Sequence, residues 1–383
     1  MSEKPASYDA DATSLVPQRG REGPAPLPMH QVVRFGEKAI EMKLLAIDQV
    51  EEALAAQDDG RRRGLDRSIG AWLHDRGLLD LVQVQTIMAA LGETERGRLV
   101  PDIELLSLLG RGTSGAVYRG RHLKLGVDVA VKIRAPRRES DDPNAMRFKL
   151  EAKLGERLVH PNIVRLYSAG ETRDYTYHVL EHIDGLPLDR MLKSEGRLPE
   201  LFVIEVGRQM CSALECAERE KIVHRDIKPA NILITRETQA KLCDLGLAKD
   251  LQKGTYLTAD GVLLGSPFYL APEYAKTGDI DTRGDIYSLG VTLYHCATGF
   301  VPFPGKTAME ILQRVVRDAA PDPRNYVATL TEGFARVVMK MMAKDPRERF
   351  QTPAEAGAAL AELAKGKSDS GINKILGFFK RPK

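Results

Sequence analysis

The eight residues 224–231, HRDIKPAN, constrain this chain more than any other segment, because they place a carboxylate, an ammonium group and an amide in one short polar stretch. Asp226 can accept a hydroxyl proton, Lys228 can offset charge on a migrating phosphoryl group, and Asn231 can bind a metal ion. Thirteen residues later, Asp244 of DLG follows the apolar segment AKLC, where a carboxylate ending a strand can hold a hard cation. Together these four side chains predict one reaction centre for phosphoryl chemistry.

A glycine-rich segment lies upstream of this centre. LLGRGTSGAVYRG contains Gly110, Gly112, Gly115 and Val117 in the spacing GxGxxGxV. Glycines allow the backbone of a β-hairpin to approach phosphate oxygens closely, with its N–H groups facing them. Dinucleotide-binding βαβ folds carry the same glycines, but there a helix begins at the last glycine, whereas here strand follows strand. An ordinary glycine-rich hairpin without a ligand is the competing interpretation.

A lysine in an apolar strand is the next candidate. The run VAVKI contains Lys132, and its apolar neighbours predict a buried strand. A buried lysine needs an anionic partner. We expect Glu151 to be that partner, because it faces inward together with two leucines on a predicted helix over 145–158. Glu156 is the alternative partner, and two solvated side chains that never meet are the simplest interpretation.

In this order and spacing, the motifs resemble those of the eukaryotic-type Ser/Thr protein kinase domain, in the form common in bacteria. The resemblance covers residues 103–363, about two thirds of the chain. It implies an α+β, bilobal fold with a β-rich N-lobe and a helical C-lobe, with ATP bound between the lobes. It also implies transfer of the γ-phosphoryl group of ATP to protein Ser/Thr hydroxyls.

The resemblance implies a role for each matching residue. Lys132 would hold the α- and β-phosphates and pair with Glu151. Asp226 would be the catalytic base, and Lys228 would contact the γ-phosphate. The remaining residues of the implied site are Gly110, Gly112, Gly115, Val117 and Ala130 around ATP, Leu180 behind the adenine, the backbones of Glu181 and Ile183 on the adenine edge, and Asn231 with Asp244 on Mg²⁺, for which Mn²⁺ is the alternative.

Other matches have a structural meaning in the family. Glu273 of LAPE would pair with Arg349 of DPRERF, and Asp285 would brace the catalytic loop. The motif DLG departs from the family's DFG, but Leu245 can fill the same apolar slot. Ser266 stands where threonine is more usual and could bridge Asp226 and Lys228.

Arg225, directly before the predicted base, concerns regulation. In the family this arginine marks kinases whose activation segment is ordered by a phosphate group. The segment 245–272 offers Thr255, Tyr256 and Thr258. We expect autophosphorylation at Thr255 or Thr258, and merely exposed loop hydroxyls are the alternative.

Two other functions compete with protein phosphorylation. A pseudokinase scaffold would bind nucleotide and partner proteins without transfer, although no catalytic position is missing. A small-molecule phosphotransferase is the third interpretation. The LAPE segment and its threonine-bearing loop favour protein substrates, because in the family they form a peptide-docking surface.

Composition limits the remaining possibilities. The length of 383 residues predicts two or three domains, and the net charge of +3 excludes a global basic field for nucleic acid. The four cysteines lack disulfide or metal-ligand spacing and are expected to be buried thiols in a reducing compartment. The N-terminus lacks a signal-peptide core, and the uncharged stretch 286–305 suits a buried helix better than a membrane span. We therefore expect a cytoplasmic protein.

An internal repeat precedes the kinase-like region. Residues 34–57 align with 68–91 at a period of 34, each as two helices joined by a turn. The repeat resembles the N-terminal domain of type II secretion and type IV pilus ATPases, some of which bind cyclic di-GMP. Because each half departs from that pattern at different positions, a protein-docking or dimerising module is the favoured interpretation over a cyclic dinucleotide sensor.

These observations predict five segments. They are a disordered leader 1–30, a helical module 31–92, a linker 93–102, a protein kinase domain 103–364 and a basic tail 365–383. The tail has six basic and one acidic side chains among apolar residues. Peripheral membrane contact is one interpretation of it, and a frayed or core-docked tail is the favoured one.

Overall fold

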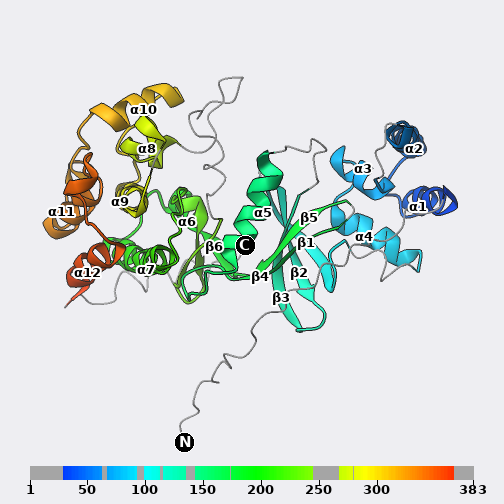
Figure 1. Cartoon of the computed structure of the whole chain (residues 1–383), viewed down its shortest axis with the longest axis horizontal. Helices are drawn as coiled ribbons and strands as arrows, with labels where there is room; N and C mark the ends of the chain where they lie inside the picture. Colours follow the sequence, from blue (N-terminus) through cyan, green and yellow to red (C-terminus); the bar gives the residue numbers. More distant parts are fainter. Residues whose placement is uncertain are drawn as a thin grey trace, which may run out of the picture. The chain divides into compact units, whose positions relative to one another are not determined.

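The structure is a computed structural model that describes residues 29–62, 67–92, 99–112, 115–134, 143–172, 174–244, 267–278 and 280–365. The chain divides into two compact units. The first comprises Met1–Arg138 with Leu166–His182, and the second Glu139–Arg165 with Ile183–Lys383. Strands dominate part of the first unit, helices dominate the second, and further helices precede the strands (Figure 1). The expected α+β class is therefore confirmed, whereas the five segment boundaries stay a prediction.

The helical module opens the first unit. Its helices are α1 (Met29–Glu41), α2 (Ile47–Arg62), α3 (Ile69–Asp75) and α4 (Leu81–Ala90). A Cβ atom on Gly36 of α1 would lie 2.4 Å from Cγ1 of Val50 in α2, and a Cβ on Gly70 of α3 would lie 2.6 Å from Cγ1 of Val84 in α4. Both helix pairs therefore close through the same glycine–valine contact, 34 positions apart, which confirms the repeat.

The two repeats share one small hydrophobic core. Its buried members come from all four helices and both turns: Phe35, Ala39, Leu45, Val50, Ala53, Ile69, Leu73, Leu79, Val84, Ile87 and Met88. Helix α1 packs against α4, and α2 against α3, so each repeat covers the other. Neither helix pair could bury its apolar face alone.

The strands of the first unit form one antiparallel sheet in the order β1-β2-β3-β5-β4. They are β1 (Ile103–Gly112), β2 (Gly115–His122), β3 (Val127–Arg134), β4 (Leu166–Glu171) and β5 (Thr176–Glu181). Alternate residues of the strands are buried on one face. That face carries Ala116, Tyr118, Val129, Val131, Ile133, Tyr177 and Val179, and these pack with Ala71 of α3 and Leu81 of α4. Helices α3 and α4 therefore cover one face of the sheet (Figure 1).

A matched pair of substitutions tests this cover. Leu81 is fully buried, whereas Ile47, its counterpart 34 positions earlier in α2, is 63% exposed. We expect Leu81→Ala to lower the free energy of unfolding by about 2–5 kcal/mol, because it leaves a cavity between α4 and the sheet. Ile47→Ala should cost less than about 0.5 kcal/mol. Trp72 in α3 is the only tryptophan of the chain, so urea unfolding followed by its fluorescence measures the stability of both variants. Equal losses of stability in the two variants would contradict the packing of α4 against the sheet.

The second unit is built mainly of helices. Its elements are α5 (Pro143–Gly155), β6 (Gly185–Pro187), α6 (Leu188–Glu195), α7 (Glu200–Arg219), η1 (Pro229–Asn231), β7 (Ile232–Thr235), β8 (Ala240–Leu242), η3 (Pro267–Tyr269), α8 (Pro272–Thr277), α9 (Thr282–Thr298), α10 (Ala308–Arg317), η4 (Pro323–Asn325), α11 (Glu332–Met341), η5 (Pro346–Glu348) and α12 (Pro353–Ala364). Helix α5 ends three residues before the end of the predicted helix 145–158, so Leu158 lies beyond it.

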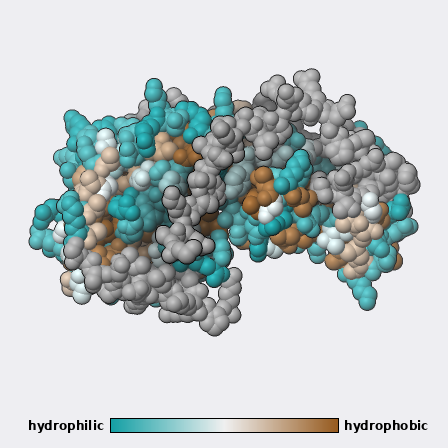
Figure 2. Space-filling model, turned by 90° about the horizontal axis from the view of Figure 1, so that it is seen from below, coloured by the Kyte–Doolittle hydropathy of each residue, from teal (hydrophilic) through white to brown (hydrophobic). Residues whose placement is uncertain are grey.

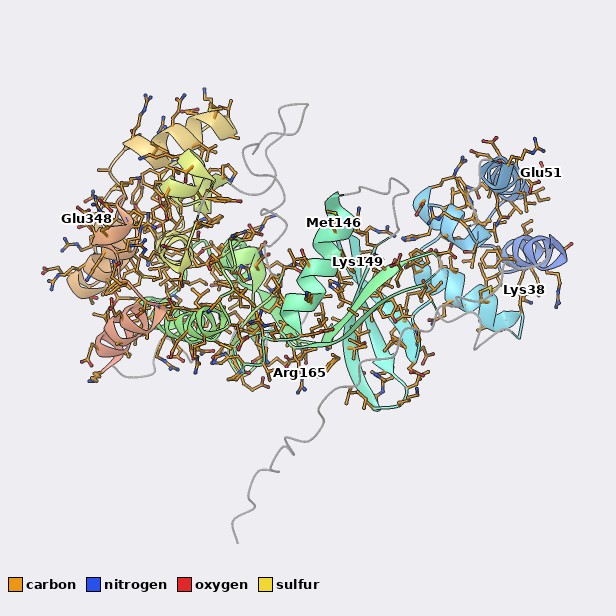
Figure 3. The ribbon with its side chains drawn as sticks, in the orientation of Figure 1. Lys38, Glu51, Met146, Lys149, Arg165 and Glu348 are labelled. Atoms are coloured by element: carbon orange, nitrogen blue, oxygen red, sulfur yellow. The ribbon has the colours of Figure 1, made fainter. Side chains whose placement is uncertain are left out.

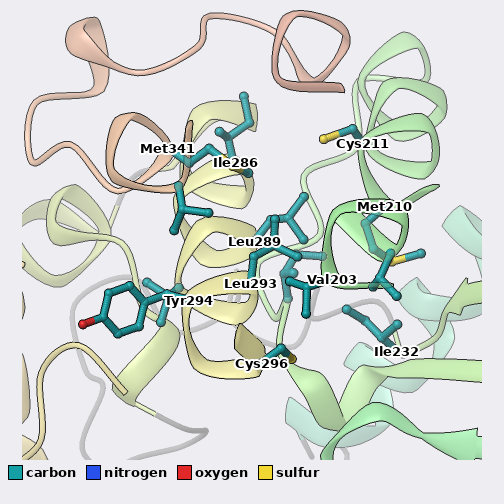
Figure 4. Close-up of a cluster of buried hydrophobic side chains, with 14 of the residues drawn as sticks. Val203, Met210, Cys211, Ile232, Ile286, Leu289, Leu293, Tyr294, Cys296 and Met341 are labelled. Carbon is teal, nitrogen blue, oxygen red and sulfur yellow. The ribbon is translucent and has the colours of Figure 1, made fainter. Parts of the chain in front are cut away.

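Helix α9 is the centre of the second unit. Every residue from Gly284 to Thr298 is buried except His295. It packs against α7 and α11, and Leu289 and Leu293 lie among side chains of these helices in Figure 4. This confirms the buried helix predicted for the uncharged stretch, as far as Thr298. Within the described parts of the chain, no helix is long and apolar enough to cross a membrane.

The four cysteines are all free, but only half of them are buried. Cys211 and Cys296 lie in the core, where burial raises the pKa of the Cys211 thiol to about 12. Cys216 and Cys243 are partly exposed, so the expectation of four buried thiols was wrong for these two. Their helix and loop positions face partly toward solvent.

A small exposed apolar patch lies at the turn between β2 and β3. Leu123, Leu125 and Val127 are each at least 41% exposed, and Figure 2 shows apolar surface at this end of the sheet.

Candidate active site

A buried carboxylate of α9 holds the loop that contains HRDIKPAN. Asp285 is 1% exposed, and its Oδ2 and Oδ1 accept hydrogen bonds from the backbone N–H groups of His224 at 2.7 Å and Arg225 at 2.8 Å. Arg225 has a φ of 67°, in the left-handed region that non-glycine residues rarely adopt. The two hydrogen bonds stabilise this conformation. The predicted bracing role of Asp285 is therefore confirmed.

The three polar side chains of the motif converge. Lys228 Nζ donates to Asp226 Oδ2 at 2.7 Å, and Asn231 Nδ2 donates to the same oxygen at 2.8 Å. Asn231 Nδ2 also donates to the backbone oxygen of Asp226 at 2.8 Å. The side chain of Asp226 is 17% exposed and that of Lys228 is 20% exposed. The carboxylate is thus held in one orientation, beside a positive charge and in partial contact with solvent.

A short β-hairpin brings the two candidate metal ligands to one end. In the β7–β8 pairing Ile232 lies opposite Leu242, and the N–H of Cys243 donates to the carbonyl of Asn231 at 2.9 Å. Asp244 follows directly, with a left-handed φ of 54°. Because the amide nitrogen of Asn231 donates to Asp226, its Oδ1 is the side-chain atom that could bind a cation.

These two oxygen donors suit Mg²⁺. That ion is usually held by one or two protein ligands and completes its octahedron with water and phosphate oxygens. Among the residues that the structure describes, no group of three His, Cys, Asp or Glu side chains could hold a metal by itself. The donor set therefore fits a metal that arrives with a phosphate ligand.

His224 is a site residue that the sequence reasoning did not single out. It is 1% exposed, its Nδ1 accepts from the N–H of Asp226 at 3.3 Å, and its Nε2 therefore donates to the carbonyl of Cys243 at 3.3 Å. It links the loop of Asp226 to the residue before Asp244. A histidine placed directly before Arg225 and the predicted base Asp226 was the available signal.

The glycine-rich hairpin lies in the first unit. Gly110 pairs with Val117 across β1 and β2, and Gly112 pairs with Gly115. Gly115 has a φ of 128°, and a Cβ there would lie 2.4 Å from the carbonyl oxygen of Ile133, so only glycine fits. A Cβ on Gly110 or Gly112 would meet nothing within 4 Å. The bare backbone at these two glycines is open to an approaching phosphate.

Other residues that are predicted to bind the nucleotide lie on one face of the sheet. Lys132 is 3% exposed and lies opposite Val117 of β2, and Ala130, two positions earlier, lies opposite Leu180 of β5. Because side chains alternate along a strand, these residues share the face opposite to the one that packs on α3 and α4. Glu181 ends β5.

Some predicted residues are not tested by this geometry. Ile183 and the partly buried Glu151 of α5 belong to the second unit, so the pairing of Lys132 with Glu151 stays a prediction. Leu245, Thr255, Tyr256, Thr258 and Ser266 lie outside the described residues.

The predicted ion pair of Glu273 is confirmed. Arg349 donates from Nη1 and Nη2 to the two carboxylate oxygens of Glu273, each at 2.7 Å. It also donates to the carbonyls of Ala343 at 2.7 Å and Arg283 at 2.9 Å, and its side chain is completely buried. The pair therefore joins the N-terminus of α8 to the segment after α11.

Comparison with known proteins agrees with these motifs. Residues 103–359 match the model of the protein kinase domain. The chain is 37% identical over 269 residues to the probable serine/threonine-protein kinase CPE1738 of Clostridium perfringens. It is 35% identical over 268 residues to the serine/threonine-protein kinase PknB of Mycobacterium tuberculosis, and 34% over 249 residues to the serine/threonine-protein kinase PrkC of Bacillus subtilis.

These matches cover 65% to 70% of this chain but only 38% to 43% of each relative, so the chain spans about two fifths of the length of the curated relatives it matches. The family match begins at residue 103 and so does not include the helical module. Since that match spans more than half of the chain and coincides with the motifs described above, the chain belongs to the protein kinase domain family.

Proposed function

We propose that this protein is a Ser/Thr protein kinase that transfers the γ-phosphoryl group of ATP to hydroxyl groups of protein substrates. The observation that carries the proposal is the convergence of Lys228 and Asn231 on the carboxylate of Asp226. Lys228 in this loop is the pattern of Ser/Thr kinases rather than tyrosine kinases. A scaffold without transfer would not need these three side chains in one cluster.

In the proposed reaction, Asp226 orients the substrate hydroxyl and accepts its proton as the oxygen attacks phosphorus. Lys228, 2.7 Å from that carboxylate, offsets the charge on the transferred group. Asn231 and Asp244 would hold Mg²⁺, which when bound neutralises charge on the phosphate oxygens. Lys132 and the glycine hairpin would position ATP.

A transfer assay tests the proposal. The full chain is incubated with γ-labelled ATP and a generic protein substrate, with Mg²⁺ or with EDTA, and labelled amino acids are identified after hydrolysis. We expect label on phosphoserine and phosphothreonine, and none when EDTA removes the metal. Binding of ATP without label in either the substrate or the chain would favour the scaffold instead. Mn²⁺ in place of Mg²⁺ shows whether the site accepts the larger ion.

The same assay addresses regulation. We propose that Thr255 or Thr258 is autophosphorylated and that Arg225 binds the resulting phosphate. Mass spectrometry of the chain before and after incubation with ATP should find phosphate on one of these threonines. Two unmodified threonines in an active preparation would contradict this part of the proposal.

For the helical module we propose a docking role, with cyclic di-GMP binding as the alternative. The first repeat keeps Arg34, Gly36 and Gln57 of the cyclic di-GMP pattern. Gln57, however, is 2% exposed and donates to the carbonyl of Arg67 at 2.7 Å, so this amide serves an internal contact. Calorimetric titration of the full chain with cyclic di-GMP decides between the two, because heat of binding would support the sensor.

A further inference from the structure

The helical module contacts the edge strand of the sheet through one amide side chain. Gln85 of α4 donates from Nε2 to the carbonyl of Leu105 at 3.2 Å, and its Oε1 accepts from the N–H of Leu105 at 3.0 Å. The amide thus occupies both backbone groups of one β1 residue, as a neighbouring strand would. β1 is at the end of the strand order, so these two groups have no strand beyond them among the described residues.

The next strand is contacted by the start of the same helix. The N–H of Leu81 donates to the hydroxyl of Tyr118 in β2 at 3.5 Å, and both residues are fully buried. Burial raises the pKa of the Tyr118 hydroxyl, so it remains a neutral partner. Tyr118 lies beside Val117, which faces the nucleotide side of the sheet. Helix α4 therefore touches both strands of the glycine-rich hairpin from behind.

A third contact lies at the turn before β5. The N–H of Ser68 donates to Oδ1 of Asp174 at 3.1 Å, and the rings of His74 and Tyr175 meet edge to face with centroids 6.3 Å apart. Asp174 and Tyr175 come directly before the first residue of β5. The module is thus bound to the sheet at points that are far apart in sequence.

This contact face belongs to the second repeat alone. Gln85 and Leu81 correspond, 34 positions earlier, to Glu51 and Ile47 of α2, and both of these are exposed. Figure 3 labels Glu51 on α2. The same fold therefore carries a docking face in one repeat and a solvated face in the other, which indicates that the contact with β1 depends on particular residues rather than on the fold of the repeat.

The hairpin beyond Gln85 is irregular. The pairing of β1 with β2 shifts register between Leu105 and Ser107 and again between Leu108 and Gly110. Such bulges bend a strand and increase its local twist. Leu105 is the last regularly paired residue of β1 before these register shifts. The place at which Gln85 holds Leu105 therefore influences the position of the glycines that follow in β1.

We propose that Gln85 is a positioning residue for nucleotide binding: by holding β1 at Leu105, the helical module sets the position of the hairpin that contains Gly110 and Gly112. This inference rests on the proposed use of ATP. It makes the module part of the nucleotide-binding apparatus instead of a separate appendage. A partner that moved α4 would thereby change the affinity for ATP.

The test compares Gln85→Glu with Glu51→Gln in the full chain. Glutamate has the shape of glutamine and can still accept from the N–H of Leu105, but it cannot donate to the carbonyl. We expect the KM for ATP to rise about threefold to tenfold, with kcat changed less than twofold. The reason is that the hydrogen bond to the carbonyl of Leu105 is lost and that the new carboxylate repels this carbonyl oxygen. Glu51→Gln should leave both unchanged.

Two further measurements separate positioning from a loss of stability and from failure of the proposed reaction. The dissociation constant for a non-hydrolysable ATP analogue should rise by the same factor, and amide hydrogen exchange over 105–118 should speed up. A lower melting temperature and kcat with an unchanged analogue affinity would overturn the inference and leave Gln85 a purely structural residue. Wild-type protein that binds the analogue but transfers no phosphate would contradict the proposed kinase activity, while the analogue affinities would still decide the role of Gln85.

Discussion

Asp226→Asn is expected to lower kcat for phosphoryl transfer by about 10²–10⁴-fold, while the KM for ATP changes little. Asparagine keeps the size of the side chain, and its Oδ1 can still accept from Lys228 Nζ, which lies 2.7 Å from the carboxylate in the wild-type chain. The variant loses only the negative charge and the capacity to take a proton. The loss should therefore appear in the chemical step and not in nucleotide binding.

Steady-state kinetics with a protein substrate measure this effect, together with calorimetric binding of the ATP analogue. Glu332→Gln is a suitable control, because that carboxylate is 68% exposed and pairs with Arg336 on the surface of α11. It should leave kcat and KM unchanged. If Asp226→Asn retained more than a tenth of the wild-type kcat, Asp226 would not be the base, and an orienting role alone would remain.

Glu273→Gln is expected to lower the free energy of unfolding of the second unit by about 3–5 kcal/mol. The guanidinium of Arg349 is completely buried, and Glu273 provides its only carboxylate partner among the described residues. Glutamine can accept with one oxygen but places an N–H₂ group against the second guanidinium nitrogen. The buried positive charge then keeps only neutral partners in direct contact, which is the main cost.

The exposed pair Asp345 and Arg347 is the matched control, close in sequence to Arg349. The Arg347 side chain is 84% exposed, and it also forms a bidentate contact, donating from Nε and Nη2 to the two carboxylate oxygens of Asp345. Asp345→Asn keeps the side-chain oxygen that caps η5 and should lower the free energy of unfolding far less than Glu273→Gln does. Urea unfolding followed by far-UV circular dichroism compares the two variants. Equal losses would show that burial does not determine the strength of the Glu273 pair.

Much of the catalytic cluster could be predicted from sequence because its members are close along the chain. Asp226, Lys228 and Asn231 lie within six positions, so one loop conformation is enough to bring them together. The pair of Glu273 and Arg349 spans 76 positions and was predicted only through the family resemblance. No local pattern indicates which distant arginine will be buried beside a given carboxylate.

Other features were decided by packing. Helix α5 ends at Gly155 although the apolar pattern continues to Leu158, because Leu158 joins the core of the second unit from beyond the helix. Cys216 and Cys211 lie on the same helix and both contact the core, but only Cys211 is fully buried. His224 links the catalytic loop to the end of β8 through its hydrogen bond with the carbonyl of Cys243, which directly follows that strand. In each case the deciding neighbour is remote in sequence.

The helical module shows most clearly which features the sequence determines and which depend on tertiary packing. The period of 34 residues, the paired glycines Gly36 and Gly70, and two helices in each repeat were all determined by the amino-acid sequence, because they depend on contacts within one repeat or its neighbour. Ile47 and Leu81 are both apolar at equivalent positions, yet one is 63% exposed and the other is fully buried. Only the presence of the sheet beside α4 makes this difference, since the burial of an apolar side chain depends on the surface that it meets in the folded chain.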